Sequence, residues 1–143
     1  MINSIVDGIS IKLNNVFGDE YKIYSEDVKQ GFDEPCFFIL LLNPSKKQLV
    51  GQRYEREHHF DIHFFPSNKE NANNQMNSVA DTLLDALEYI TVDGNLLRGT
   101  KMKVEPVDNV LHFFVSYNFI VRKEPLGEVN LMEELKIERT EVK

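Results

Sequence analysis

The chain has little of what several common functional classes require. It contains one cysteine, Cys36, in 143 residues, so it forms no internal disulfide and no thiolate metal site, which indicates a reducing compartment. No apolar run approaches the length of a membrane-spanning helix. The first residues lack the basic region and continuous apolar stretch of a signal peptide. We therefore expect a soluble protein made in the cytoplasm.

Basic residues are also scarce. Lysine and arginine number 16 against 23 acidic residues, which gives a net charge of −7. This excess opposes binding to nucleic acid or to an anionic bilayer, because phosphate recognition needs clustered Lys and Arg. Apolar residues at 42% and charged residues at 27% are ordinary for a globular protein. The length suits a single domain, and neither nucleic acid nor a membrane is an expected partner.

Recognisable catalytic motifs are missing as well. The sequence contains no GxSxG, no GxxxxGK[ST] and no GxGxxG. Cys36 begins an apolar segment, where a buried and unreactive thiol is the usual outcome. We therefore predict a binding or assembly protein rather than an enzyme, with no catalytic residue, no cofactor and no bound metal.

What is present is a clear succession of hydrophobic patterns. Apolar residues at three- and four-residue steps predict two helices, the first ended by Gly18 and the second begun by a capping box of Ser67 and Glu70. Alternating or continuous apolar runs predict five strands. In chain order these are a helix over 1–17, strands over 21–28, 36–42 and 53–65, a helix from 67 to about 90, and strands over 102–107 and 110–123.

The order α-β-β-β-α-β-β predicts an α/β (α+β) fold, with a mostly antiparallel sheet of about five strands and both helices on one face. The last two strands should form a hairpin about Asp108-Asn109. That register places Val104 opposite Phe113 and Met102 opposite Val115. Residues 1–123 then form one domain, and residues 124–143 form a polar C-terminal tail that either docks, for example on a neighbouring subunit, or stays mobile.

One feature of this fold predicts a contact surface. The strand over 36–42 is apolar on both faces, although its neighbours are polar on the side away from the helices. Exposed apolar surface of this kind usually marks an interface. The tail, or another copy of the chain, is expected to cover it. The predicted oligomer-interface residues are Phe37, Ile39, Leu41, Leu131, Met132 and Leu135.

The only local cluster of positive charge lies in the predicted loop over 43–52. Lys46 and Lys47 occupy this loop and Arg53 follows it. Three such charges usually belong to a solvated loop of no special role, and contact of these residues with an acidic partner is the functional hypothesis kept beside that interpretation.

A polar face of the strand over 53–65 carries metal-ligating residue types: Glu57, His59, Asp61 and His63. Alternate residues lie about 6.5–7 Å apart along a strand, so these side chains, with His112 from the hairpin, could converge on Zn²⁺ or another divalent ion. No HExxH-like spacing accompanies them, and polar residues commonly fill the wet face of a sheet, so we favour the latter interpretation. A small metal-dependent hydrolase using His59, Asp61 and His63 is the less favoured function. His58 falls on the inward face, as a core or rim histidine.

Several runs together resemble a known family. They are IVDGI at 5–9, GDEYKIY at 18–24, EPCFFI at 34–39, LNP at 42–44, YEREH at 54–58, FDI at 60–62 and LHFFVSY at 111–117. In these runs the chain is similar to the bacteriophage tail terminator or tail completion proteins of lambda type. These small proteins are encoded in tail modules of phages and defective prophages of Gram-positive bacteria. The similarity covers roughly residues 1–123.

The resemblance implies a structural role in the virion tail, after assembly in the host cytoplasm. Proteins of this kind form a homo-oligomeric ring, usually a hexamer, on the head-proximal end of the tail tube. There they stop tube polymerisation and provide the joining surface for the head. The implied partners are other copies of the chain, the tail tube protein and head–tail connector proteins. Another connector or tail completion protein of related fold is the alternative.

Overall fold

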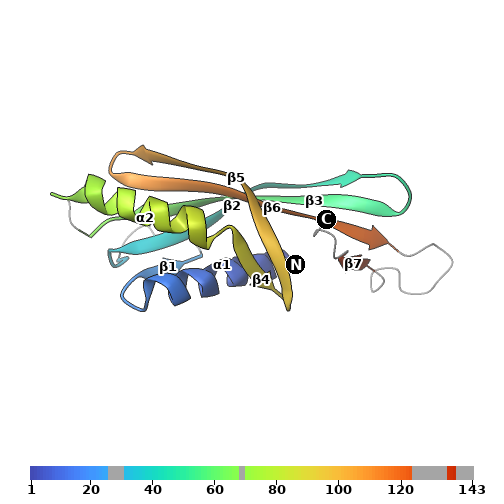
Figure 1. The fold of residues 1–143 in the computed structure, drawn as a ribbon, viewed down its shortest axis with the longest axis horizontal. Coiled ribbons are helices and arrows are strands. Elements are labelled where there is room, and N and C mark those ends of the chain that lie inside the picture. The colour runs from blue at the N-terminus through green and yellow to red at the C-terminus, as the bar shows by residue number, and fades with distance from the viewer. Residues whose placement is uncertain (26–30, 68–69, 124–134, 138–143) are drawn as a thin grey trace.

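A long twisted sheet carries two helices against one part of its length (Figure 1). The computed structural model describes residues 1–25, 31–67, 70–123 and 135–137. No helix within these ranges is long and apolar enough to cross a bilayer. The elements in chain order are α1 (Ile2–Phe17), β1 (Lys22–Tyr24), β2 (Cys36–Gln48), β3 (Arg53–Phe65), α2 (Ala72–Ala86), β4 (Tyr89–Val92), β5 (Asn95–Val107), β6 (Val110–Lys123) and β7 (Leu135–Ile137).

The sheet has seven strands rather than the expected five. Its order is β1-β2-β3-β6-β5-β4, and β7 pairs with β6 off this path. Only β1 with β2 is parallel among these described pairs. The predicted α+β class, with a mostly antiparallel sheet and two helices, is confirmed. The two added strands are β4 and β7, which are both short. In addition, β4 lies where the apolar pattern fits either a helix or a strand.

The second helix differs from its prediction at both ends. It begins at Ala72 with Asn71 as its N-cap and makes no side-chain cap bond, so the capping box at Ser67 and Glu70 is wrong. The backbone N–H of Ser67 instead donates to the side-chain oxygen of Gln75 at 3.0 Å. The helix ends at Ala86, and Tyr89–Val92 form β4, where exposed and buried side chains alternate. Ile90 fits the spacing of apolar residues in a helix as well as in a strand. For this reason the predicted helix extends too far, to about residue 90.

The hairpin of β5 and β6 is confirmed, and its predicted register holds from the turn as far as Lys103. Val104 lies opposite Phe113, as predicted. Beyond this point the register shifts between Thr100 and Lys103, so the predicted pairing of Met102 with Val115 is wrong. Lys101, inside the shifted segment, has a φ of 54°. An extra residue of this kind is a β-bulge, which no apolar alternation reveals.

Strand β5 belongs to two ladders. Its first residues pair with β4, where Arg98 lies opposite Tyr89, and from Gly99 onward it pairs with β6. At this corner a Cβ on Gly99 would lie 2.7 Å from the Leu87 carbonyl oxygen and 2.8 Å from Cγ2 of Val115. The corner can therefore form only around a residue without a side chain.

The core lies between the helices and one face of the sheet. Strand residues Phe60, Ile62, Phe64, Leu111, Phe113, Val115 and Tyr117 meet helix residues Ile5, Ile9, Leu13, Met76, Val79 and Leu83 there. Phe37 and Ile39 belong to the same core, with 0% and 2% of their surface exposed, and Leu41 packs partly buried against it. Two of the residues predicted to meet a neighbouring subunit are thus buried inside their own.

The other face of β2 is partly covered from within the chain. The ring of Phe38 packs against Tyr24, Phe32 and Phe65 at centroid distances of 5.0, 5.4 and 5.4 Å. Beside it, burial and then the nearby Glu34 and Asp33 carboxylates raise the pKa of Cys36 to about 12. The thiol therefore stays protonated, as the sequence predicts. Further along this face Leu42 is 38% exposed.

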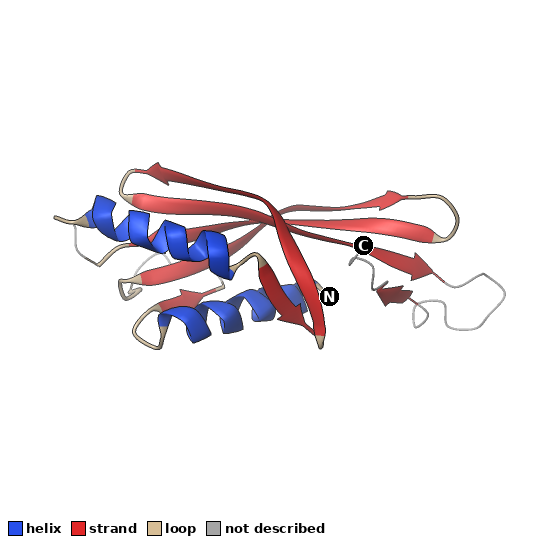
Figure 2. Ribbon diagram, in the orientation of Figure 1, coloured by secondary structure: helices blue, strands red, loops and turns tan. Residues whose placement is uncertain are grey.

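Beyond the helices β2 and β3 continue as a projecting hairpin (Figure 2). We call residues 43–56 the arm. The segment was expected to be a loop, but β2 runs to Gln48 and pairs with β3 up to Tyr54. All of residues 43–48 are exposed, so neither face of this segment shows the apolar alternation that identifies a strand.

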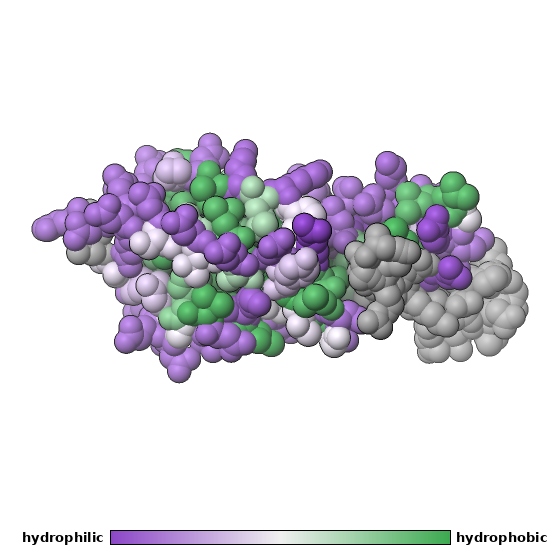
Figure 3. Space-filling model, in the orientation of Figure 1, coloured by the Kyte–Doolittle hydropathy of each residue, from purple (hydrophilic) through white to green (hydrophobic). Residues whose placement is uncertain are grey.

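Figure 3 shows hydrophobic groups scattered among hydrophilic ones on the visible face of the molecule.

Candidate functional site

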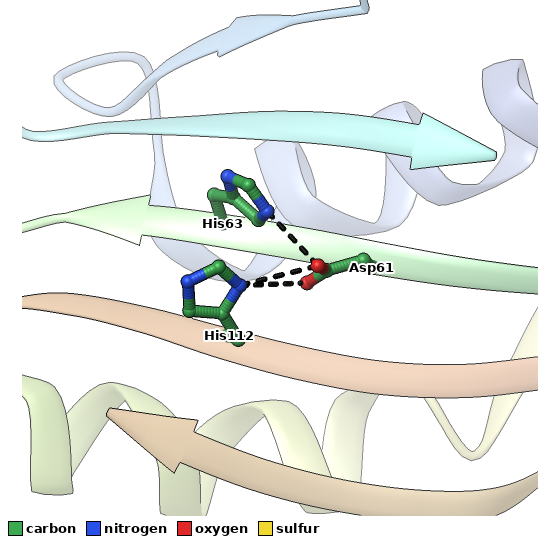
Figure 4. Close-up of side chains that lie close together, drawn as sticks. All are labelled: Asp61, His63 and His112. Atoms are coloured by element: carbon green, nitrogen blue, oxygen red, sulfur yellow. Dashed lines mark hydrogen bonds and ion pairs between the residues drawn. The ribbon is translucent and has the colours of Figure 1, made fainter. Parts of the chain in front are cut away.

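The face of the sheet opposite the helices carries a compact group of titratable side chains (Figure 4). We call Asp61, His63 and His112 the His–Asp cluster. Asp61 and His63 are alternate residues of β3 and so share one face. His112 lies directly opposite His63 in the antiparallel ladder with β6. The register of two strands distant in sequence therefore assembles the group.

One carboxylate holds both imidazoles of the cluster. Nε2 of His63 lies 3.0 Å from Oδ2 of Asp61. Nδ1 of His112 lies 3.1 Å from the same oxygen and 3.3 Å from Oδ1. The ring centroids are 4.2 Å apart. Both rings thus direct a nitrogen at Oδ2 of one carboxylate, and ligand atoms of the three residues lie within 4.8 Å of one another.

The carboxylate at the centre of the cluster is largely shielded from solvent. Asp61 is 9% exposed and lies between Leu40 and Phe114 in the two ladders. Burial raises the pKa of the Asp61 carboxyl, but the hydrogen bonds and charges of His63 and His112 outweigh it, and the pKa falls below its usual range. The carboxylate therefore remains ionised at neutral pH.

The other residues of the predicted polar face form a separate group. Nδ1 of His59 is hydrogen-bonded to the Ser116 hydroxyl. Glu57 accepts a hydrogen bond from Ser45 at 3.0 Å and lies 3.7 Å from Nε2 of His59. The predicted trio of His59, Asp61 and His63 therefore does not come together. Among the residues described, the group with the spacing of metal ligands is Asp61, His63 and His112, the last of which the sequence named as a further ligand.

His58 points into the core, as expected from the alternation. It is 0% exposed and stacks on Phe119 with ring centroids 5.1 Å apart. Its Nδ1–H donates to the carbonyl oxygen of Tyr117 at 3.1 Å, whereas Nε2 has no hydrogen-bond partner within the described structure. Burial lowers the pKa of His58, although the bond to Tyr117 works in the opposite direction.

The buried ring predicts an acid-sensitive fold. His58 binds a proton less readily in the folded chain than in the unfolded chain. The stability that the neutral ring gives to the fold is therefore fully present above the unfolded pKa of about 6.5, and it is lost as the pH falls below that value. His58→Met should therefore show a smaller loss of unfolding free energy than the wild type between about pH 7 and pH 5. Urea titrations at both pH values measure this, with His59→Met as control. Equal losses in His58→Met and wild type would contradict the assignment.

The basic residues predicted to meet a partner lie on the arm. Lys46 and Lys47 are strand residues rather than loop residues. Nζ of Lys46 lies 4.5 Å from the Tyr54 ring centroid, and Lys47 faces Glu55 in the ladder. Arg53 begins β3 and is half-buried. Both lysines are exposed and lie together near the tip of the arm.

The C-terminal part of the predicted interface is only partly described. Leu135 belongs to β7 and pairs with Lys123 of β6 in the same chain. Leu131 and Met132 lie outside the described residues. Strand β7 occupies the edge of β6 that β5 leaves when it turns toward β4.

Two surface hollows lie away from the cluster. An open hollow of about 300 Å³ at the start of α2 is lined by Glu70, Asn71, Ala72, Asn73, Asn74 and Asn109. A second, of about 240 Å³, is lined by Glu34, Phe65, Pro66, Asp108, Asn109 and Val110. Neither includes a residue of the His–Asp cluster, which is therefore an open group on a sheet face rather than part of either hollow.

Comparison with known proteins gives one informative match. A family model described as phage tail terminator protein matches residues 4–127. A solved structure is similar over 87% of this chain and 98% of that chain, with 10% sequence identity and a TM-score of 0.44, which is too distant to inform fold or function. No protein of curated function matches the chain.

Proposed function

The chain belongs to the phage tail terminator family, and we propose that it caps the head-proximal end of a tail tube as a homo-oligomeric ring. Membership confirms the resemblance found in the sequence, makes the chain a component of the virion tail, and places it in a structural rather than an enzymatic family. The proposal extends this to ending tube polymerisation and presenting the joining surface for the head. The family match is the observation that supports it.

A ring of identical subunits needs two different surfaces on each copy, because its contacts run head to tail. The shape of the chain suits this arrangement, since the arm projects at one end and both helices lie toward the other (Figure 1). We assign the arm to contacts outside its own subunit. On β2, Leu41 remains a candidate for contact with a neighbour, and the exposed Leu42 is added to it, whereas Phe37 and Ile39 are buried in the core of their own subunit.

The positive charge on the arm favours an acidic partner. Lys46 and Lys47 are exposed on a chain whose net charge is −7, so they provide local attraction where the rest of the surface repels. We propose that they, with Arg53, contact the tube protein or a head–tail connector protein. The tail residues Leu131, Met132 and Leu135 remain predicted contacts between subunits. No catalytic step is assigned to any residue.

The decisive experiment combines the chain with its tube protein. A native mass spectrum of the mixture, or of the free chain, should show a species near six copies of the 16.6 kDa subunit. In cells that lack the chain, tail tubes should grow beyond their normal length, and supplying it should restore that length. Tubes of normal length without the chain would contradict the capping role. Binding to a connector but not to the tube would identify a head–tail connector instead.

A further inference from the structure

We propose that the His–Asp cluster binds one Zn²⁺ ion through a carboxylate oxygen of Asp61, Nε2 of His63 and Nδ1 of His112. The inference does not depend on the proposed role in the tail. Two imidazoles and one carboxylate form a donor set suited to divalent transition metals, whereas Mg²⁺ and Ca²⁺ prefer sites made of oxygen. Water would occupy the fourth position.

The distances between the donor atoms fit this ion. With Zn–N and Zn–O distances of about 2.0–2.1 Å, neighbouring ligands of a tetrahedral site lie about 3.3 Å apart. The separations between each histidine nitrogen and the Asp61 carboxylate are 3.0 to 3.3 Å. An ion can therefore replace the two ring protons once both rings turn to direct these nitrogens at it. The protons then reside on the other ring nitrogens, Nδ1 of His63 and Nε2 of His112.

The surroundings hold the donors in place and keep the site accessible. All three residues are fixed by the ladder between β3 and β6, so their backbone positions do not depend on a loop. The side chains of His63 and His112 are 22% exposed and that of Asp61 is 12% exposed, which leaves an approach from solvent. Glu105 lies opposite His112 in the ladder with β5, and so places a further negative charge beside this ring.

The same three side chains serve hydrogen bonding and metal binding. The two oxygens of a carboxylate can accept from both imidazoles, and here two imidazoles converge on one nearly buried carboxylate from different strands. His59, on the same face, is hydrogen-bonded to a serine. This convergence also provides what a divalent ion needs, which is several donors at one point. Such an ion would link β3 to β6 at the middle of the sheet.

Isothermal titration of the purified, metal-free chain with ZnCl₂ tests the proposal. The wild type should bind one equivalent of Zn²⁺. His112→Ala should lower the affinity for Zn²⁺ by about tenfold to a hundredfold or more. His59→Ala serves as the matched control, since it removes an imidazole from the same face outside the cluster, and it should bind like the wild type. Equal binding in the wild type and His112→Ala, or no binding by the wild type, would overturn the proposal.

Two measurements on the wild type keep the test valid if a variant misfolds. Zn²⁺ at a hundredfold excess over its Kd should raise the Tm by roughly 5–10 °C, because the ion binds only the folded chain. Co²⁺ in place of Zn²⁺ should give the visible absorption of a four-coordinate site. An unchanged Tm together with the spectrum of hydrated Co²⁺ would exclude the site.

Discussion

Gly99→Val should destabilise the fold by at least about 3 kcal/mol, which is a large part of the stability of a typical domain. The first added carbon would lie 2.7 Å from the carbonyl oxygen of Leu87, a backbone atom that cannot rotate away. The same corner holds two further contacts. The Gly99 N–H donates to the Glu88 carbonyl at 2.6 Å, and the Tyr117 hydroxyl donates to the Leu87 carbonyl at 2.6 Å. Relieving the clash would break both.

A graded series makes this prediction specific. Gly99→Ala should destabilise less than Gly99→Val, because the valine methyl groups meet Val115 and Tyr117 as well. Arg98→Val is the control, since it places the same side chain one residue earlier on an exposed position and should change stability by no more than about 0.5 kcal/mol. Urea unfolding followed by circular dichroism compares the three. A Gly99→Val protein as stable as wild type would show that β5 does not turn there as described.

Reversing the charge of Lys46 and Lys47 should abolish tail completion while leaving the fold intact. Both side chains are exposed, so the double variant Lys46→Glu/Lys47→Glu should unfold within about 0.5 kcal/mol of the wild type. If the arm contacts an acidic partner, the new charges repel it, and affinity should fall tenfold or more. The loss should shrink as salt is raised, because salt screens exposed charges.

The matched control changes the same net charge elsewhere. Lys22→Glu/Lys103→Glu alters two exposed lysines that lie off the arm, and it should complete tails normally. Sedimentation of tube protein with each variant, and tail length in a complementation assay, provide the readouts. Normal tails with the arm variant would remove Lys46 and Lys47 from the proposed contact, without affecting the family assignment.

Local signals in the sequence predicted most of the fold. Apolar spacing over 1–17 with Gly18 gave the first helix, and the alternation over 53–65 gave β3 at its observed bounds. The Asp108-Asn109 turn, with φ values of 51° and 62°, gave the hairpin. Each of these depends on residues close together in the chain, where period and turn chemistry act directly.

The errors have two physical origins. The outer part of β2 escaped prediction because it is exposed on both faces and contains Asn43-Pro44, so neither period nor propensity marks it. The His–Asp cluster was predicted only in part. The sequence names all three of its residues among the possible ligands but does not separate them from Glu57 and His59. That choice requires the register of β3 with β6, and these strands are separated by α2, β4 and β5.

The arm also affects how the chain avoids aggregation. Strand β1 covers β2 only from Cys36 to Phe38, so beyond that point the outer edge of β2 has no partner strand within the described part of the chain. Exposed edges invite pairing with other chains, and proline, lysine and bulges are the usual means of preventing it. All three means occur here, since Pro44, Lys46 and Lys47 lie close together on this strand, next to the register shift between Leu42 and Ser45. The residues assigned to a specific partner thus also discourage unspecific strand pairing, and solubility must be checked whenever they are changed.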